Sequence, residues 1–350
     1  MAFLTSMRRK VKSWQILAFV VIGCLIYVLI RQRGQNNFFT SLDDDLLPRV
    51  NLLQASGRLS GKNFNGEVQD AESPSGNVVR SGEPVGDLAD KDRSLNSLAC
   101  VPLRAAATPQ VKICIYPPNE DAIISRSLLF NGTWDEDTLE DFKVALTSDS
   151  ELGLIDIGAN LGTYSLVAAS MGRPVVAVEA NHFTAIRMKR SVEINNFRDR
   201  VSIIQAAIMP ERGYARMEIP EGDIGAAYPI AIDKDIITDK DRHDHLIIKT
   251  MRLEDIVPYV KFKSAILKMD IGGEEYGVLH LADRLFDVRQ IKYVFMVFSP
   301  NKGEQLGRSR GVRFLQERGY IPKISTRHSQ MFMGLENDSW PSHLVWIKEN

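Results

Sequence analysis

A glycine-rich turn with an acid in front of it is the part of this sequence with the clearest chemical meaning. The letters D-I-G-A-N-L-G run from Asp156 to Gly162, at the end of the apolar run Leu152–Ile157. Gly158 and Gly162 let the backbone pass close to a ligand, and the helix that follows presents free N–H groups. A carboxylate at the strand end repels a pyrophosphate. The turn therefore favours a ligand that is cationic or carries hydroxyl and amino groups.

A second acid, Glu179, ends the next apolar run, 23 residues after Asp156. At that place a carboxylate accepts hydrogen bonds from the hydroxyls of a ribose. A nucleoside without phosphates fits the two acids together, and S-adenosylmethionine is such a ligand. The structural alternative is a tight turn followed by a solvated strand end. An NAD-dependent oxidoreductase is disfavoured, because dinucleotide sites read G-x-G-x-x-G and this turn reads G-x-N-x-G.

The elements that must position these residues alternate between apolar runs and amphipathic stretches. Continuous apolar strands separated by helices indicate a parallel sheet covered on both faces, so we predict an α/β, doubly wound domain over residues 100–350. The predicted strands are Leu152–Ile157, Pro174–Glu179, Val201–Gln205, Ser264–Asp270 and Tyr293–Phe298. One predicted helix follows the glycine turn and ends near Met171. Two others cover His182–Asn195 and Glu274–Leu285.

Four motifs together resemble the FkbM family of class I methyltransferases. They are D-I-G-A-N-L-G, V-E-A at Val178–Ala180, R-L-E-D at Arg252–Asp255 and K-M-D at Lys268–Asp270. The likeness covers about residues 150–300, and a weaker likeness at Lys112–Trp134 is to the lead-in of membrane-anchored animal members. The resemblance implies a mostly parallel, seven-stranded Rossmann-like sheet, S-adenosylmethionine as cofactor, and methylation of hydroxyl groups, often on sugars or natural products.

The resemblance also implies roles for single residues. The loop that holds the methionine part of the cofactor is matched by Asp156, Gly158, Asn160 and Gly162. Glu179 matches the acid that binds the ribose. Asp270 matches the acid of the family motif K-[IM]-D-[VI]-E-G-x-E, and Asp270 or Glu274 is the best candidate for a catalytic base.

The catalytic half of the pattern departs from the family. Gly272 stands where the family usually has glutamate, while Val297 and Ser299 stand where the following strand commonly ends in an E-x-H-like pair. Two acids and a histidine are therefore missing from the expected acceptor site. Two functions stay open: an O-methyltransferase acting on a glycan or another hydroxyl acceptor, and a cofactor-binding but catalytically silent partner or scaffold protein.

The first hundred residues differ in composition from the rest. Residues 14–30 are a 17-residue stretch whose only polar members are Gln15 and Tyr27, with four cations before it and two after it. We predict an uncleaved transmembrane signal anchor that leaves residues 1–13 in the cytoplasm. A cleaved signal peptide or a buried helix are the alternatives. Residues 31–99 predict a flexible stem, since they hold too little apolar surface to offset the entropy of ordering.

An anchor, a stem and one luminal domain predict a single-pass type II protein of the Golgi or endoplasmic reticulum membrane. Glycosylation sequons at Asn131 and Asn337 agree with a luminal domain. In an oxidising lumen Cys100 and Cys114 could form a bridge or remain two buried thiols.

Charge and metal-ligand patterns predict neither a nucleic-acid partner nor a metal site. Forty-three basic and 44 acidic residues give a net charge of −1, which does not predict a nucleic-acid partner. The letters H-D-H at residues 243–245 could ligate a metal, but no third ligand follows at supporting spacing, so no metal site is predicted.

Overall fold

The computed structural model describes residues 78–79, 98–108, 110–238, 244–297, 305–327 and 343–349. The predicted anchor at 14–30, nearly all of the predicted stem and the sequon at Asn337 lie outside these ranges. No helix within them is long and apolar enough to cross a membrane.

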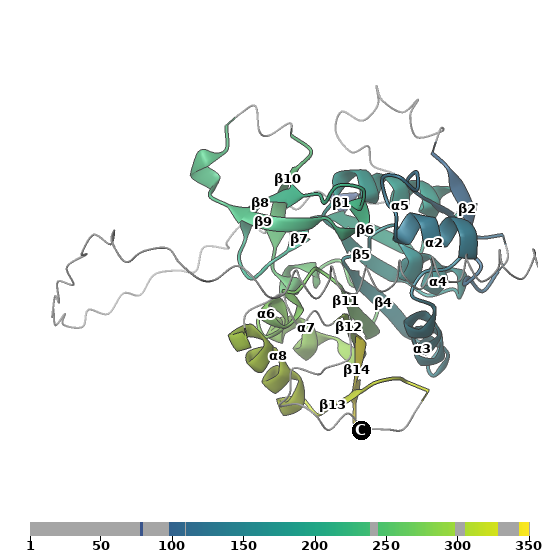
Figure 1. Cartoon of the computed structure of the whole chain (residues 1–350). Coiled ribbons are helices and arrows are strands. Elements are labelled where there is room, and N and C mark those ends of the chain that lie inside the picture. Colours follow the sequence, from purple (N-terminus) through teal and green to yellow (C-terminus); the bar gives the residue numbers. More distant parts are fainter. Residues whose placement is uncertain are drawn as a thin grey trace, which may run out of the picture. The chain divides into compact units, whose positions relative to one another are not determined.

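A mixed sheet of eight strands forms the centre of the domain (Figure 1). Its five middle strands are parallel and lie in the order β6 (Val201–Gln205), β5 (Val175–Glu179), β4 (Leu152–Ile157), β11 (Ser264–Met269) and β12 (Gln290–Val297). Next to β12, β14 (His343–Lys348) runs antiparallel, followed by β13 (Tyr320–Lys323). At the other edge β1 (Val78–Val79) pairs antiparallel with β6. The sheet confirms the predicted Rossmann-like class, with one strand more than the seven expected.

Helices cover both faces of this sheet, as the apolar strands require (Figure 1). One face packs against α2 (Ile124–Asn131), α3 (Glu136–Thr147), α4 (Thr163–Ser170) and α5 (His182–Ile194). The other packs against α6 (Glu275–Leu279), α7 (Asp283–Val288) and α8 (Gln305–Glu317). Successive residues of a strand point to opposite faces, so Leu154 and Ile155 of β4 enter different cores. The predicted helix Glu274–Leu285 is thus two helices, separated by a turn at the buried Ala282.

A second, four-stranded sheet lies between β6 and β11 in the chain, where the sequence predicts no element. Its strands are β7 (Ala207–Ile208), β10 (Ile247–Met251), β8 (Gly213–Glu218) and β9 (Tyr228–Ile232), in that order. Short 3₁₀ turns are Ile224–Ala226, Lys234–Ile236 and Leu253–Ile256. Only a small core buries one side of this sheet, so its strands lack the continuous apolar runs of the central ones.

A hairpin of β2 (Cys100–Pro102) and β3 (Lys112–Cys114) precedes α2. Cys100 and Cys114 are paired across its strands and joined by a disulfide. The backbone N–H of Cys114 donates to Ser191 Oγ on α5 at 2.8 Å, which fastens the hairpin to the domain. Of the two alternatives for these cysteines, the structure has the bridge.

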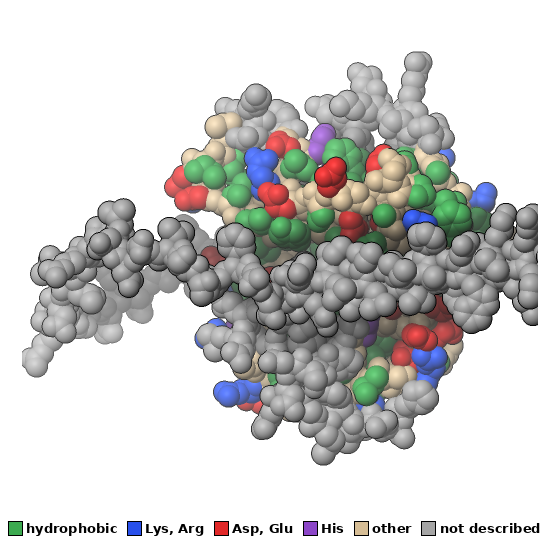
Figure 2. All heavy atoms as spheres, in the orientation of Figure 1, with side chains coloured by type: hydrophobic (Ala, Val, Ile, Leu, Met, Phe, Trp, Pro, Cys, Tyr) green, Lys and Arg blue, Asp and Glu red, His purple; other side chains and the backbone are tan. Residues whose placement is uncertain are grey.

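Acidic and basic side chains are interspersed on the face of the molecule drawn in Figure 2, among apolar and neutral ones. Neither sign gathers over one element in the described part of that face, in keeping with the net charge of −1.

Candidate active site

The glycine turn after β4 has a backbone that only particular residues can adopt. Gly158, Asn160 and Gly162 have φ values of +72°, +52° and +91°. A Cβ on Gly158 would lie 1.9 Å from the carbonyl oxygen of Asp270. The turn therefore passes against the end of β11 with no room for a side chain. Asparagine at 160 is among the few other residues that tolerate a left-handed conformation.

Glu179 holds this turn against the end of β5. Its carboxylate accepts the backbone N–H of Asn160 at 2.8 Å and that of Asn181 at 2.7 Å. The residue is 8% exposed, and burial raises the pKa of Glu179 to about 7 in spite of these two hydrogen bonds. Each carboxylate oxygen has a second lone pair, so the group can still accept a hydroxyl.

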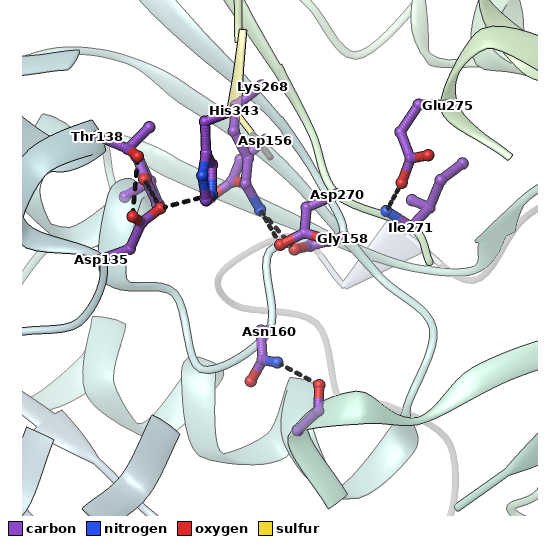
Figure 3. Close-up of polar contacts among 12 residues, drawn as sticks. Asp135, Thr138, Asp156, Gly158, Asn160, Lys268, Asp270, Ile271, Glu275 and His343 are labelled. Atoms are coloured by element: carbon purple, nitrogen blue, oxygen red, sulfur yellow. Dashed lines mark hydrogen bonds and ion pairs between the residues drawn. The ribbon is translucent and has the colours of Figure 1, made fainter. Parts of the chain in front are cut away.

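A buried ion pair lies beneath the turn (Figure 3). Asp156 is fully buried and accepts the hydroxyl of Ser165 at 2.7 Å, and its other oxygen lies 3.5 Å from Lys268 Nζ. Lys268 Nζ also donates to the carbonyl oxygen of Gly158 at 2.9 Å and lies 3.9 Å from Asp270. Although burial opposes it, the carboxylates of Asp156 and Asp270 raise the pKa of Lys268. Lys268 is therefore a fixed cation that braces the turn.

A cleft with about 1120 Å³ of empty space, part of it open to solvent, lies at the carboxyl ends of β4, β5 and β11. Glu179 and the turn line one end, while Val178, Ala206 and Ile208 give it apolar walls. The second sheet supplies the opposite wall through Ile224–Ala227 and Pro229. The side-chain nitrogen of Asn181 is buried here with no hydrogen-bond partner among the described residues. Apolar walls, a carboxylate and an unpaired donor suit a nucleoside.

A second, smaller cavity adjoins this cleft, with about 540 Å³ of empty space that includes open solvent. The two share Ile124, Trp134, Asn160, Asp270 and Val297 in their walls. The further polar or aromatic residues that line the second cavity are Asp135, Thr138, Thr163, Tyr164, Lys268, Phe295 and His343. We call the cleft the cofactor half and the second cavity the acceptor half.

Only some of the residues predicted from the sequence line the site. Gly158, Asn160, Glu179 and Asp270 line the cofactor half. Asp156 and Gly162 line neither half: Asp156 lies beneath the turn, and Gly162 directs the chain into α4.

Glu274 is exposed and lines neither half, whereas its neighbour Glu275 lines the cofactor half. Glu275 accepts the backbone N–H groups of Ile271 and Gly273 at 2.8 and 3.1 Å, and burial raises the pKa of Glu275 (Figure 3). The unusual Gly272 and Val297 do face the site, and Ser299 lies outside the described residues.

The sequence prediction missed Asp135 and His343. Asp135 directly follows the lead-in segment Lys112–Trp134, which was the one available signal for it. His343 begins a strand that the sequence analysis does not predict, and no local pattern marks it. The side chains of the two residues meet: Asp135 Oδ2 lies 3.4 Å from His343 Nε2.

The H-D-H letters do not form a metal site within the described residues. Asp244 pairs with Arg216 at 3.3 Å, and the ring of His245 stacks on His182 with centroids 4.1 Å apart. His243 lies outside the described ranges, within which no group of three or more His, Cys, Asp or Glu side chains could hold a metal ion.

Comparison with known families identifies the domain. Residues 156–322 match the family model of the methyltransferase FkbM domain. The chain carries an FkbM methyltransferase domain. S-adenosylmethionine is the cofactor of this family, and the cofactor half offers the groups that a nucleoside requires. No curated protein matches the chain.

Among solved structures, the chain is similar to several methyltransferases at low identity. For the METTL16 methyltransferase domain the identity is 14%, with 60% of this chain and 65% of that chain covered and a TM-score of 0.33. For precorrin-6y C5,15-methyltransferase from Geobacter metallireducens the identity is 14%, with 60% of this chain and 89% of that chain covered and a TM-score of 0.31. For the N-terminal domain of human METTL16 in complex with SAH the identity is 14%, with 60% of this chain and 68% of that chain covered and a TM-score of 0.29. The chain thus spans less than two thirds of the first of these domains.

Proposed function

We propose that this FkbM protein transfers a methyl group from S-adenosylmethionine to a hydroxyl group of a glycan in the lumen of the Golgi or endoplasmic reticulum. The observation that carries the proposal is the junction of two cavities at Asn160 and Asp270. One cavity has the features of a nucleoside site, and the other has polar and aromatic walls that suit a hydroxyl-bearing acceptor.

The cofactor half binds by groups that are already oriented. Glu179 accepts hydrogen bonds from the ribose hydroxyls, and Val178, Ala206 and Ile208 give apolar contact to the base. Gly158 lines the cleft, so its backbone can contact the methionine part of the cofactor. When bound, S-adenosylmethionine supplies an electrophilic methyl group on a positively charged sulfur.

Asp156 acts through Lys268 and not by contact with the ligand. Its carboxylate is buried and fixes the ammonium group that donates to the carbonyl of Gly158. It is therefore a positioning residue for the turn, although the family motif suggests a binding role.

The acceptor half suits a sugar ring. A sugar presents an apolar face and a rim of hydroxyls, and Trp134 and Phe295 offer aromatic surface beside the polar Asp135, Asp270 and His343. Transfer to oxygen requires the acceptor in line with the methyl group, so positioning supplies most of the acceleration.

The luminal location is supported by chemistry at three places. The disulfide Cys100–Cys114 is of the kind that persists in oxidising compartments. Asn131 of the sequon N-G-T is exposed at the end of α2. The apolar stretch 14–30, with its excess of cations on the N-terminal side, is the proposed anchor of a type II protein.

Mass spectrometry of glycans from cells with and without the full-length protein tests the reaction. We expect glycans heavier by about 14 Da, one methyl in place of hydrogen, only with the wild-type protein. They should be absent with Glu179→Gln and present with the exposed control Glu218→Gln. Calorimetry of the detergent-solubilised chain with S-adenosylhomocysteine runs in parallel. If S-adenosylhomocysteine binds but no glycan is methylated, the alternative function, a cofactor-binding but catalytically silent scaffold protein, would replace this proposal.

Protease treatment of intact microsomes tests the location separately. The proposal expects a protected domain whose mass falls after deglycosidase digestion. A domain degraded in sealed vesicles would show that it faces the cytosol.

A further inference from the structure

Asp135 and His343 form a polar pair in the acceptor half to which the family match assigns no role. Asp135 precedes α3 and His343 begins β14, so both lie outside the matched residues 156–322. Their side chains are 19% and 35% exposed, and both line the second cavity. Figure 3 shows His343 between Asp135 on one side and Lys268 with Asp270 on the other.

The backbone at Asp135 is shaped for this pair and not for the helix. Asp135 is the N-cap residue of α3, but its carboxylate makes no hydrogen bond to the helix backbone, and its φ is +53°. The carboxylate accepts instead the hydroxyls of Tyr164 at 2.7 Å and Thr138 at 2.8 Å. A strained aspartate that gives up its capping role is typical of a functional site.

The sheet brings His343 to the place where the sequence lacks a polar group. In the antiparallel pair of β12 and β14, His343 lies opposite Val297. The strand that ends at Val297 carries no acid or base there, and the neighbouring strand supplies an imidazole at the same edge of the sheet.

The other titratable groups that face this cavity are less suited to accept a proton. Lys268 on β11 is held as a cation by its carboxylate neighbours. Burial raises the pKa of Tyr164 on α4, and its hydroxyl already donates to Asp135. Asp270, directly after β11, is a carboxylate with 46% of its side chain exposed. An imidazole is the side-chain group that most often serves as a general base.

We propose that His343 is the catalytic base of the acceptor half and that Asp135 is the positioning residue that holds its ring; this inference rests on the proposed function. A bond forms between the acceptor oxygen and the methyl carbon. The bond from that carbon to sulfur breaks, and its electron pair stays on sulfur. The hydroxyl proton passes to Nδ1 of His343, the ring nitrogen that does not face Asp135, and then to solvent. Asp135 faces Nε2 and stabilises the imidazolium that forms.

Methyl transfer by full-length variants tests this assignment, with radiolabelled S-adenosylmethionine and released N- and O-glycans as probes. His343→Gln should lower kcat by about 10²–10⁴-fold and remove the fall in kcat at acid pH, while the Kd of S-adenosylhomocysteine changes less than threefold. Added imidazole should restore part of the rate in His343→Ala. The matched control is His280→Gln, a histidine at the end of α6 that lines neither half.

A readout without turnover tests the positioning role of Asp135. In cofactor-free protein with ¹⁵N-labelled histidine, six histidines give signals, and His343→Gln identifies the relevant one. We expect the Nε2–H tautomer of His343 in the wild type and a mixture of tautomers in Asp135→Asn. Asparagine keeps the size of the side chain and tolerates the positive φ.

Each result separates the inference from the proposed function. A wild-type rate in His343→Gln overturns the base and leaves the methyltransferase intact, and loss of the rate in Asp270→Asn alone would move the base to Asp270. An unchanged tautomer in Asp135→Asn overturns the positioning role. No transfer by the wild type, in spite of S-adenosylhomocysteine binding, overturns the proposed function and this inference with it.

Discussion

The two halves of the site are assembled in different ways. In the cofactor half, Gly158, Asn160 and Glu179 come from one strand–turn–helix–strand unit, and Glu179 accepts the backbone N–H of Asn160 at 2.8 Å. In the acceptor half, Asp135 and His343 come from segments about two hundred residues apart, and their nearest atoms are 3.4 Å apart. The family motifs in the sequence therefore predict the cofactor half and do not predict the acceptor half.

Burial separates the halves as well. Glu179 is 8% exposed, whereas the side chains of Asp270 and His343 are 46% and 35% exposed. A buried, hydrogen-bonded half is ordered before its ligand arrives, which lowers the entropic cost of binding. The exposed side chains of the acceptor half can reach an acceptor that is attached to a larger molecule.

Gly158→Ala should break the cofactor half most severely. A methyl group at this φ of +72° would lie 1.9 Å from the carbonyl oxygen of Asp270, so backbone must move. We expect a loss of about 4 kcal/mol or more in the free energy of unfolding, together with loss of S-adenosylhomocysteine binding. Urea unfolding and calorimetry measure the two effects.

Gly172→Ala is the matched control for that change. Gly172 has a similar φ of +80° but nothing within 4 Å of a Cβ. The substitution should lower the free energy of unfolding by only about 1–2 kcal/mol, the cost of a left-handed backbone at alanine, and leave S-adenosylhomocysteine binding unchanged. Equal losses in both variants would mean that the close approach to β11 is unimportant.

The double substitution Cys100→Ser and Cys114→Ser separates global stability from the two halves. Opening a loop of this length should lower the free energy of unfolding by about 3 kcal/mol. Neither cysteine lines either half, so the affinity for S-adenosylhomocysteine should stay within twofold of the wild-type value. A large loss of affinity in folded protein would show that the hairpin orders the cofactor half through α5.

The smallest expected effect is a pH dependence of cofactor affinity through Glu179. Ribose hydroxyls bind the ionised carboxylate better than the protonated one, and the pKa of Glu179 is about 7 in the unliganded protein. Affinity should therefore rise with pH, by about tenfold between pH 6 and pH 8, with release of a proton on binding.

Calorimetry with S-adenosylhomocysteine in two buffers of different ionisation enthalpy measures both quantities. Glu179→Gln should abolish this pH dependence, whereas Glu218→Gln, exposed on β8, should keep it. An affinity that falls with rising pH in the wild type would argue against hydrogen bonds from ribose to Glu179.

The central strands and the cofactor half could be predicted because their signals are local. The central strands are largely buried between two layers of helices, so most of their residues are apolar, and each strand lies within three residues of its predicted start. The glycine turn follows β4 directly, and Glu179 is the last residue of β5. The second sheet and the short β1 could not be predicted, because a strand buried on one side or only two residues long has a weak pattern.

The amino-acid sequence by itself determined the α/β class, the place of the glycine turn and Glu179 as the acid beside it. Strand periodicity and the backbone conformations of glycine depend on only a few neighbouring residues. Only the tertiary structure decided three other points. It buried Asp156 against Lys268, directed Glu275 inward in place of Glu274, and brought Asp135 to His343. These contacts depend on strand order and on register such as that of Val297 with His343. Strand order and register result from the packing of the whole sheet, so no short stretch of sequence contains them.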